Sequence, residues 1–176
     1  ADCARRKRSF EYGAALLNYN ETASRSMAAV KYKNKREYLD YYAQESVRRC
    51  GPLLRSMKAG ALIPVPIHPK RLRTRGFNQA EVLARKLGEA LSLPVCAGIL
   101  ERSRNTEPQK ELRASERLRN LEKAFCVRGE CELPHSAILI DDIYTTGSTV
   151  EACARALKKA GMERVYFFAL CIGQGE

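Results

Sequence analysis

The sequence contains no tryptophan, only two histidines (His68 and His135), and no apolar run of membrane-spanning length. Its longest apolar run, VYFFALCI at 165–172, suits a buried strand, so we expect no membrane insertion. The basic N-terminus has no apolar segment behind it, and we therefore expect no secretory signal there.

Paired cysteines are also scarce. The chain has seven cysteines, an odd number without close pairing, which favours a reducing, cytoplasmic location over a disulfide scaffold. Cys126 and Cys131 are the nearest pair, but no second pair or histidine cluster accompanies them. Ordinary thiols therefore explain them better than a zinc site does.

Acidic residues are outnumbered, with 20 Asp and Glu against 31 Lys and Arg, for a net charge of +11. This excess suggests an anionic partner such as a polyphosphate, a nucleic acid or an acidic protein. A solvated basic surface without a partner is the alternative. The charge gathers in two runs, one at 5–8 and one that contains Lys70, Arg71, Arg73 and Arg75.

Strand-like and helix-like segments alternate along the chain, which indicates an α/β fold with a parallel sheet flanked by helices. We predict a single domain over 1–176, because there is no repeat or low-complexity linker. The expected strands are two short ones around Gly13 within 9–19, then 61–67, 94–100, Ala137–Ile140 and Arg164–Ile172. The expected helices are Thr22–Lys33, Glu37–Arg49 ending near Gly51-Pro52, 76–91 and Thr149–Ala160.

The segment ILIDDIYTTGSTV at 138–150 carries the strongest functional signal. Asp141 and Asp142 follow an apolar strand, and the turn Thr145-Thr146-Gly147-Ser148-Thr149 leads into a helix. Hydroxyls, backbone N–H groups and the helix N-terminus together suit a phosphate, and the two carboxylates suit the vicinal hydroxyls of a ribose. Two alternatives need no ligand: Ser148 and Glu151 match a capping box, and Asp-Asp is common in turns.

Two further segments could complete a pocket. The end of the 61–67 strand and the residues after it carry Ile67, His68, Lys70 and Arg71. As a short cationic loop this stretch could hold a pyrophosphate, although such loops are often only solvated. The polar stretch 102–120 is expected to form a flexible lid that excludes water and brings Arg104 to the leaving group. A mobile loop without catalytic duty is the alternative.

These motifs resemble known proteins. The segment at 138–150 resembles the motif of type I phosphoribosyltransferases that binds 5-phosphoribosyl-1-pyrophosphate (PRPP). Together with RGFNQA at 75–80 and the block formed by Arg102, Arg104, Thr106 and Gln109, it resembles the ComF family of bacterial competence proteins over nearly the whole chain. The resemblance implies a type I phosphoribosyltransferase-like sheet with a small N-terminal β-hairpin and helix addition.

The resemblance also implies residue roles. Asp141 and Asp142 would hold the ribose and act in catalysis with Arg104, and residues 145–149 would surround the 5-phosphate. Ile67, His68, Lys70 and Arg71 would meet the pyrophosphate, and Arg102, Thr106 and Gln109 would belong to the lid. Magnesium would arrive with PRPP, with no metal held by protein ligands alone. ComF proteins usually begin with a four-cysteine zinc ribbon, of which only Cys3 would match here, so residues 1–8 are interpreted as a trimmed remnant without zinc.

Two functions follow as hypotheses. One is a magnesium-dependent phosphoribosyltransferase of unknown acceptor, with a role in DNA uptake implied by the resemblance. The other is a non-catalytic competence factor that binds single-stranded DNA, a helicase from the same operon or another competence protein. Aromatic stacking platforms for DNA are not obvious in the sequence, since there is no tryptophan and most of the eight tyrosines precede residue 45.

Overall fold

The computed structural model describes residues 8–102, 124–128 and 132–173. Four parallel strands form the central sheet in the order β1 (Gly13–Asn18), β6 (Arg164–Ile172), β5 (Ser136–Tyr144) and β2 (Ala61–Pro64). A single parallel bridge from Leu62 to Val95 extends the sheet beyond β2, where the sequence predicted a full strand over 94–100. The predicted α/β class is confirmed.

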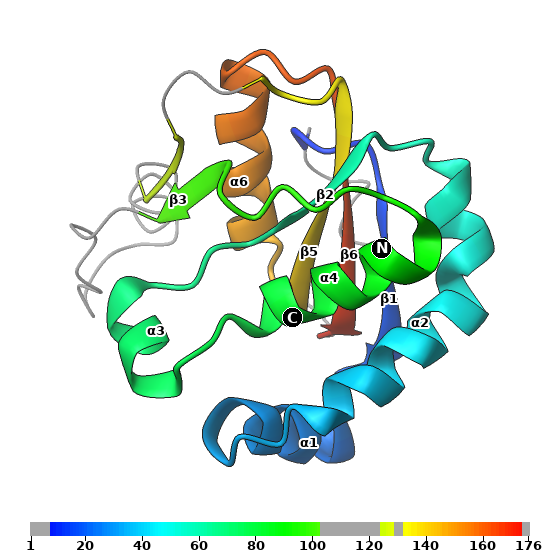
Figure 1. The fold of residues 1–176 in the computed structure, drawn as a ribbon, viewed down its shortest axis with the longest axis vertical. Helices are drawn as coiled ribbons and strands as arrows, with labels where there is room; N and C mark the ends of the chain where they lie inside the picture. The colour runs from blue at the N-terminus through cyan, green and yellow to red at the C-terminus, as the bar shows by residue number, and fades with distance from the viewer. Residues whose placement is uncertain (1–7, 103–123, 129–131, 174–176) are drawn as a thin grey trace.

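Helices cover both faces of this sheet (Figure 1). One face carries α1 (Glu21–Tyr32), α2 (Glu37–Ser56) and α4 (Gln79–Leu91), and the other carries α6 (Ser148–Lys159). Successive strand residues alternate between the two cores: Ile138 and Ile140 pack toward α4, while Ala137 and Leu139 pack toward α6. A strand buried on both faces reads as a continuous apolar run, which is why the sequence revealed β5 and β6 so clearly.

The N-terminal β-hairpin predicted around Gly13 is wrong. Gly13 begins a single strand that lies parallel to β6 at the edge of the sheet, and residues 9–12 precede it as irregular chain. The ring of Phe167 occupies the place where a side chain on Gly13 would stand, 2.2 Å from an ideal Cβ. The glycine therefore permits close packing against β6, and it does not mark a turn.

The predicted end of the second helix at Gly51-Pro52 is also wrong, because α2 continues to Ser56. Proline removes one backbone donor inside the helix, but Leu54 and Met57 beyond it are fully buried in the core. Burial of two such side chains, each worth roughly 1.5–3 kcal/mol, offsets the lost hydrogen bond.

A short helix, α3 (Pro69–Arg75), replaces the predicted cationic loop. His68 caps its start, with Nδ1 accepting a hydrogen bond from Lys70 N at 3.1 Å, and Pro69 fits the first helical position. Gly76 ends the helix at φ +80°, a conformation that suits glycine. The remaining small sheet pairs β3 (Leu100–Arg102) with β4 (Phe125–Val127) in antiparallel register and packs against the α6 side.

The chain reverses its winding between β2 and β5. The connection after β2 runs through α3 and α4 on one face, while the connection after β5 runs through α6 on the other. Ligands in open parallel sheets bind in the crevice at such a switch point, beyond the carboxyl ends of the strands. The fold thus places the two predicted phosphate-binding segments after the carboxyl ends of neighbouring strands, β2 and β5.

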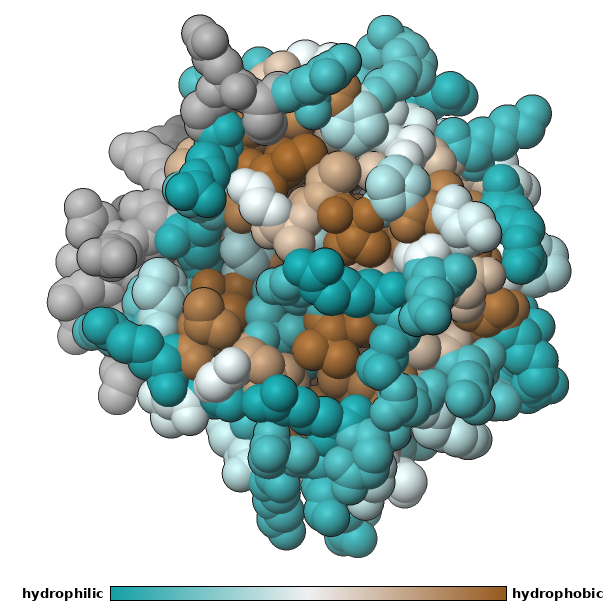
Figure 2. Space-filling model, viewed as in Figure 1, coloured by the Kyte–Doolittle hydropathy of each residue, from teal (hydrophilic) through white to brown (hydrophobic). Residues whose placement is uncertain are grey.

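Hydrophilic side chains cover most of the face shown in Figure 2, with apolar patches visible between them. Within the described ranges, no helix is long and apolar enough to span a bilayer. No disulfide bond joins any two of the five cysteines in those ranges.

Candidate functional site

The acid pair lies at the carboxyl end of β5, inside the strand. Both carboxylates are buried, and Asp142 N donates to Asp141 Oδ1 at 2.8 Å. Lys31, from the last turn of α1, forms an ion pair with Asp142. The helix α1 thereby crosses the carboxyl ends of the strands and delivers one cation to the acid pair.

The pKa values of the two carboxyl groups are shifted in opposite directions. Burial, and then the neighbouring charge of Asp142, raises the pKa of Asp141 well above its usual range. Burial alone would also raise the pKa of Asp142, but the Lys31 ammonium and hydrogen bonds to its carboxylate outweigh burial and lower that pKa. The pair therefore favours one negative charge over two, with the charge on Asp142.

The turn that follows β5 forms a small cup of about 20 Å³, lined by Asp141 and residues 143–150. Gly147 takes φ +72°, and an ideal Cβ there would lie 2.2 Å from Tyr144 Oη. Tyr144 in turn stacks on Phe167, with ring centroids 4.6 Å apart. Only glycine satisfies both the left-handed backbone and this close approach, so the shape of the cup depends on Gly147.

The capping-box explanation of Ser148 and Glu151 is wrong. Gly147 is the N-cap of α6 and has no side chain to cap the helix, and among the described residues the one side-chain hydrogen bond at this end runs from Ser148 N to Thr146 Oγ1, at 3.4 Å. Glu151 instead accepts two hydrogen bonds from Ser9, from N at 2.9 Å and from Oγ at 2.8 Å, and one from Arg155 Nε at 2.8 Å. The start of α6 therefore keeps the donor capacity and positive dipole end that suit an anion.

The N-terminal segment also reaches the cup. Arg8 Nη2 donates to the backbone oxygen of Thr146 at 3.4 Å, one residue before Ser9 binds Glu151. Inside the turn, the hydroxyls of Thr146 and Ser148 are hydrogen-bonded at 2.8 Å. Residues 8–9, before β1, thus contact the turn after β5 and the first turn of α6, although more than a hundred residues separate them in sequence.

The second predicted segment follows β2, the neighbour of β5 in the sheet, and continues into α3. Ile67 and His68 lie in the connection, and Lys70 and Arg71 lie exposed on α3. Burial, and then the charges of Arg102, Lys70, Arg71 and Arg73, lowers the pKa of His68. The cations around His68 therefore favour an anion among them.

Arg102, assigned to the lid from the sequence, ends β3 as a half-buried residue. Its guanidinium lies over the Phe125 ring, 5.3 Å from the centroid, and its Nε is buried without a hydrogen-bond partner. Burial, and then the charge of Arg71, lowers its pKa, while Asp141 acts in the opposite direction. Arg102 thus stands between the acid pair and α3 as a fixed cation. Arg104, Thr106 and Gln109 lie outside the described residues, and their lid assignment stays a prediction.

A divalent cation would find few ligands here. Within the described residues, no group of three or more His, Cys, Asp and Glu side chains could hold a metal ion. The acid pair offers two carboxyl groups, of which Asp142 is already bound to Lys31. Cys3 and Cys131 lie outside the described residues, so the zinc expectations stay untested.

Comparison with known proteins agrees with this arrangement. The phosphoribosyl transferase domain family matches residues 72–175, more than half of the chain. The chain belongs to this family. The match begins inside α3, at Leu72, and includes the acid pair and the whole turn after β5.

The most informative similarities to individual proteins are to bacterial competence and DNA utilization proteins. Competence protein F of Haemophilus influenzae is 37% identical over 112 residues, covering 62% of this chain and 49% of that protein. The DNA utilization protein YhgH of Escherichia coli O157:H7 is 36% identical over 113 residues, with 62% and 48% covered. Competence protein ComFC of Streptococcus pneumoniae is 29% identical over 161 residues, with 89% and 66% covered. The chain is thus a ComF-like member of the family, and it spans about half the length of the first two of these relatives.

Sequence reasoning missed three contributors to the site: Lys31, the pairing of Ser9 with Glu151, and Arg8. Lys31 sits in an ordinary amphipathic helix, and nothing local distinguishes it from Lys33. The contacts of residues 8–9 join distant parts of the chain, and single-sequence patterns carry no signal for such pairs.

Proposed function

We propose that this protein binds PRPP and transfers its phosphoribosyl group to an acceptor. The neighbouring carboxyl ends of β2 and β5 carry this proposal, because the segments that follow them match the two ends of the donor. The start of α6 would bind the 5-phosphate, Asp141 and Asp142 would hold the ribose hydroxyls, and α3 with Arg102 would meet the pyrophosphate. Magnesium would be held mainly through phosphate oxygens and would neutralise the leaving group.

The acid pair also suits the chemistry. Transfer passes through a cationic, oxocarbenium-like ribosyl centre, and a carboxylate held nearby stabilises such a centre. Although burial opposes it, the Lys31 ammonium lowers the pKa of Asp142, while burial raises the pKa of Asp141, so Asp142 is the member of the pair that holds a negative charge more readily. The carboxylate oxygens of the pair would accept hydrogen bonds from the ribose hydroxyls.

Calorimetric titration with PRPP and magnesium tests the proposal. We expect saturable heat that disappears when Asp141→Asn and Asp142→Asn are combined. Asp40→Asn is the matched control, because Asp40 is an exposed aspartate on α2 paired with Lys86, away from the crevice. Absence of binding by the folded wild-type protein, or equal heat in the double variant, would refute the assignment.

A role in DNA uptake is the second candidate, suggested by the names of the competence relatives and favoured by the net charge of +11. Single-stranded DNA binding by α3 would fall steeply with salt, with a log–log slope of about −0.7 per phosphate contact. Neutralising Lys70, Arg71, Arg73 and Arg75 should reduce that slope by about 3 units. Salt-independent affinity for an oligonucleotide would count against this role.

A further inference from the structure

The outer edge of the central sheet is open at β1. Among the described strands β1 pairs with β6 alone, and no described backbone hydrogen bond beyond that pairing involves residues 13–18. One row of its backbone N–H and C=O groups therefore faces away from the sheet. Proteins often protect such an edge with lysine or proline, yet the β1 sequence GAALLN contains neither. The edge can thus accept a further strand.

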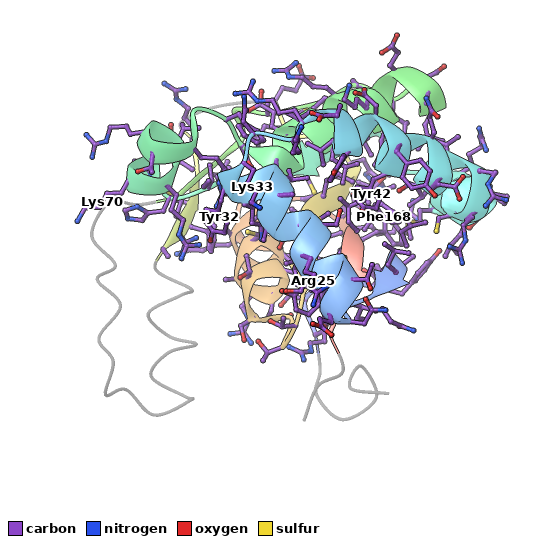
Figure 3. The ribbon with its side chains drawn as sticks, turned by 90° about the horizontal axis from the view of Figure 1, so that it is seen from below. Arg25, Tyr32, Lys33, Tyr42, Lys70 and Phe168 are labelled. Atoms are coloured by element: carbon purple, nitrogen blue, oxygen red, sulfur yellow. The ribbon has the colours of Figure 1, made fainter. Side chains whose placement is uncertain are left out.

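A cavity of about 410 Å³ runs beside this edge. Four consecutive residues of β1, 15–18, line it together with the start of α1 and two residues of α2. Neighbouring residues of a strand point to opposite faces, so four in a row indicate that the cavity opens along the strand edge. Figure 3 shows Arg25 and Lys33 toward opposite ends of α1, and the cavity lies at the Arg25 end.

Arg49, on α2, gives the cavity its charge. It is exposed, and within the described residues its guanidinium forms no hydrogen bond or ion pair. The carboxylates nearby on the two helices are already paired, Glu21 with Arg25 and Glu45 with Arg48. None of the described residues that line the cavity is acidic. The unmatched charge of Arg49 therefore favours an occupant with a carboxylate.

Apolar and aromatic groups complete the surface. Leu17 and the ring of Tyr42 line the cavity, and the Tyr42 hydroxyl is already hydrogen-bonded to Ser26 Oγ at 2.6 Å. Tyr12 and Tyr19, just before and just after β1, are 43% and 38% exposed. Aromatic side chains at the two ends of an edge strand offer cross-strand contacts to a strand that is added there.

We propose that the outer edge of β1 is a docking site for an extended acidic segment of another protein. The segment adds to the sheet as a further strand, one of its carboxylates lies against Arg49, and one of its apolar side chains enters the cavity. Backbone hydrogen bonds supply the affinity, and Arg49 supplies the preference for an acidic segment. This inference goes beyond the proposed function and does not depend on PRPP binding.

Other occupants fit this edge less well. Two copies of a chain with net charge +11 repel each other, and β1 carries no acidic residue that could meet the Arg49 of a second copy. A nucleic acid lacks the regular row of amide donors and acceptors that a strand edge pairs with.

Synthetic hexapeptides test the docking site. Six capped peptides of alternating Val and Thr each carry one Glu, at a different position in each peptide, and six counterparts carry Gln instead. In NMR titrations of the full chain we expect the amide signals of residues 14–18 to shift. The best Glu peptide should bind about fivefold more tightly than its Gln counterpart, the strength of a good exposed ion pair.

Two variants locate the charge contact. Arg49→Gln should remove the preference for the Glu peptide while the Gln peptide binds as before. Arg25→Gln is the matched control, because Arg25 is an exposed arginine at the same end of α1, is paired with Glu21 and does not line the cavity (Figure 3). It should keep the fivefold preference. Circular dichroism checks that both variants are folded.

N-methylated peptides test the strand pairing on the wild type alone. Alternate residues of a strand direct their N–H groups to the same edge. Methylating the amides of residues 1, 3 and 5 of the best peptide, or of residues 2, 4 and 6, therefore blocks one edge at a time. We expect one of the two forms to lose binding by at least about tenfold and the other to retain it.

Four outcomes would overturn the proposal. These are no shift of the β1 amides at millimolar peptide, equal affinity for the Glu and Gln peptides, an unchanged preference in Arg49→Gln, and equal behaviour of the two N-methylated forms. Sedimentation that reveals a dimer, with β1 amides that shift as the protein is concentrated, would also overturn it and assign the edge to a second copy. A dT oligonucleotide that shifts these amides when the peptides do not would assign the edge to DNA instead.

Discussion

Replacing Lys31 with methionine perturbs the acid pair most selectively. The substitution keeps the length of the side chain and removes its charge, leaving Asp142 buried without its partner. Both side chains are largely buried, with 18% of Lys31 and 11% of Asp142 exposed. Loss of one partner of a buried ion pair costs about 3–5 kcal/mol.

Protonation of Asp142 sets a limit to that cost. Bringing a proton onto a carboxyl of ordinary pKa, about 3.9, costs about 5 kcal/mol at pH 7.5 and about 1.5 kcal/mol at pH 5. We therefore expect Lys31→Met to lose about 3–5 kcal/mol of unfolding free energy at pH 7.5 and at most about 1.5 kcal/mol at pH 5. In the wild type the pKa of Asp142 is lowered, so this group stabilises the folded protein at pH values above its unfolded pKa. That stabilisation is lost as the pH falls through the folded pKa, and the wild type therefore becomes less stable in acid.

Urea unfolding followed by circular dichroism measures these differences, since the chain has no tryptophan. The double variant Lys31→Met with Asp142→Asn should recover most of the loss, because it leaves no buried charge. Lys33→Met is the matched control on the exposed end of the same helix. A loss below about 1 kcal/mol at pH 7.5, or simple additivity in the double variant, would refute the importance of the ion pair.

Three further predictions follow from the turn after β5 and the helix behind it. Gly147→Ala should cost about 2–4 kcal/mol in urea unfolding, because it forces positive φ on alanine and pushes a methyl group into Tyr144; a neutral result would contradict the close contact. Glu151→Gln should lose about 1–3 kcal/mol at pH 7 by weakening its bonds to Ser9. Burial raises the pKa of Glu151, but hydrogen bonds from Ser9 and Arg155 lower it more. The difference in unfolding free energy between this variant and the wild type should therefore shrink as pH falls below about 4, and a difference that stays constant with pH would contradict this. Burial raises the pKa of Cys153 well above its usual range, so a thiol reagent should modify it only on unfolding, and rapid labelling of the native protein would contradict its burial.

The local pattern of apolar residues was sufficient to predict much of the fold. The apolar run at 164–172 predicted β6 with its observed bounds, and the stripe at 76–91 predicted α4 closely. β5 extends four residues further than predicted, through Asp141 and Asp142, because pairing with β6 continues past the apolar run. Hydrophobicity marks where a strand is buried, and ladder hydrogen bonds decide where it ends.

Errors arose where tertiary contacts override local preference. Pro52 suggested a helix end, yet buried residues beyond it sustain α2. The loop predicted after His68 is an error of another kind, because the local signals, an N1 proline and a C-terminal glycine, favour the short helix that forms there.

The sequence also singled out the two segments that the structure places after the neighbouring strands β2 and β5. The second of them was found because Gly147, the hydroxyl residues and the adjacent acids form a compact local pattern, and its binding of phosphate stays a prediction. Lys31, the cation that pairs with Asp142, comes from a helix more than a hundred residues away. Such partners become visible only when the sheet brings the carboxyl ends of its strands together.

The central claim is that the start of α6 and the acid pair bind the phosphate and ribose of PRPP. Amide NMR spectra recorded during a titration with PRPP and magnesium test it most directly. We predict the largest shifts at the backbone N–H groups of Gly147, Ser148 and Thr149, with smaller shifts at Asp141 and Asp142. Saturating PRPP that leaves these amides unshifted, or that shifts only residues remote from the crevice, would contradict it.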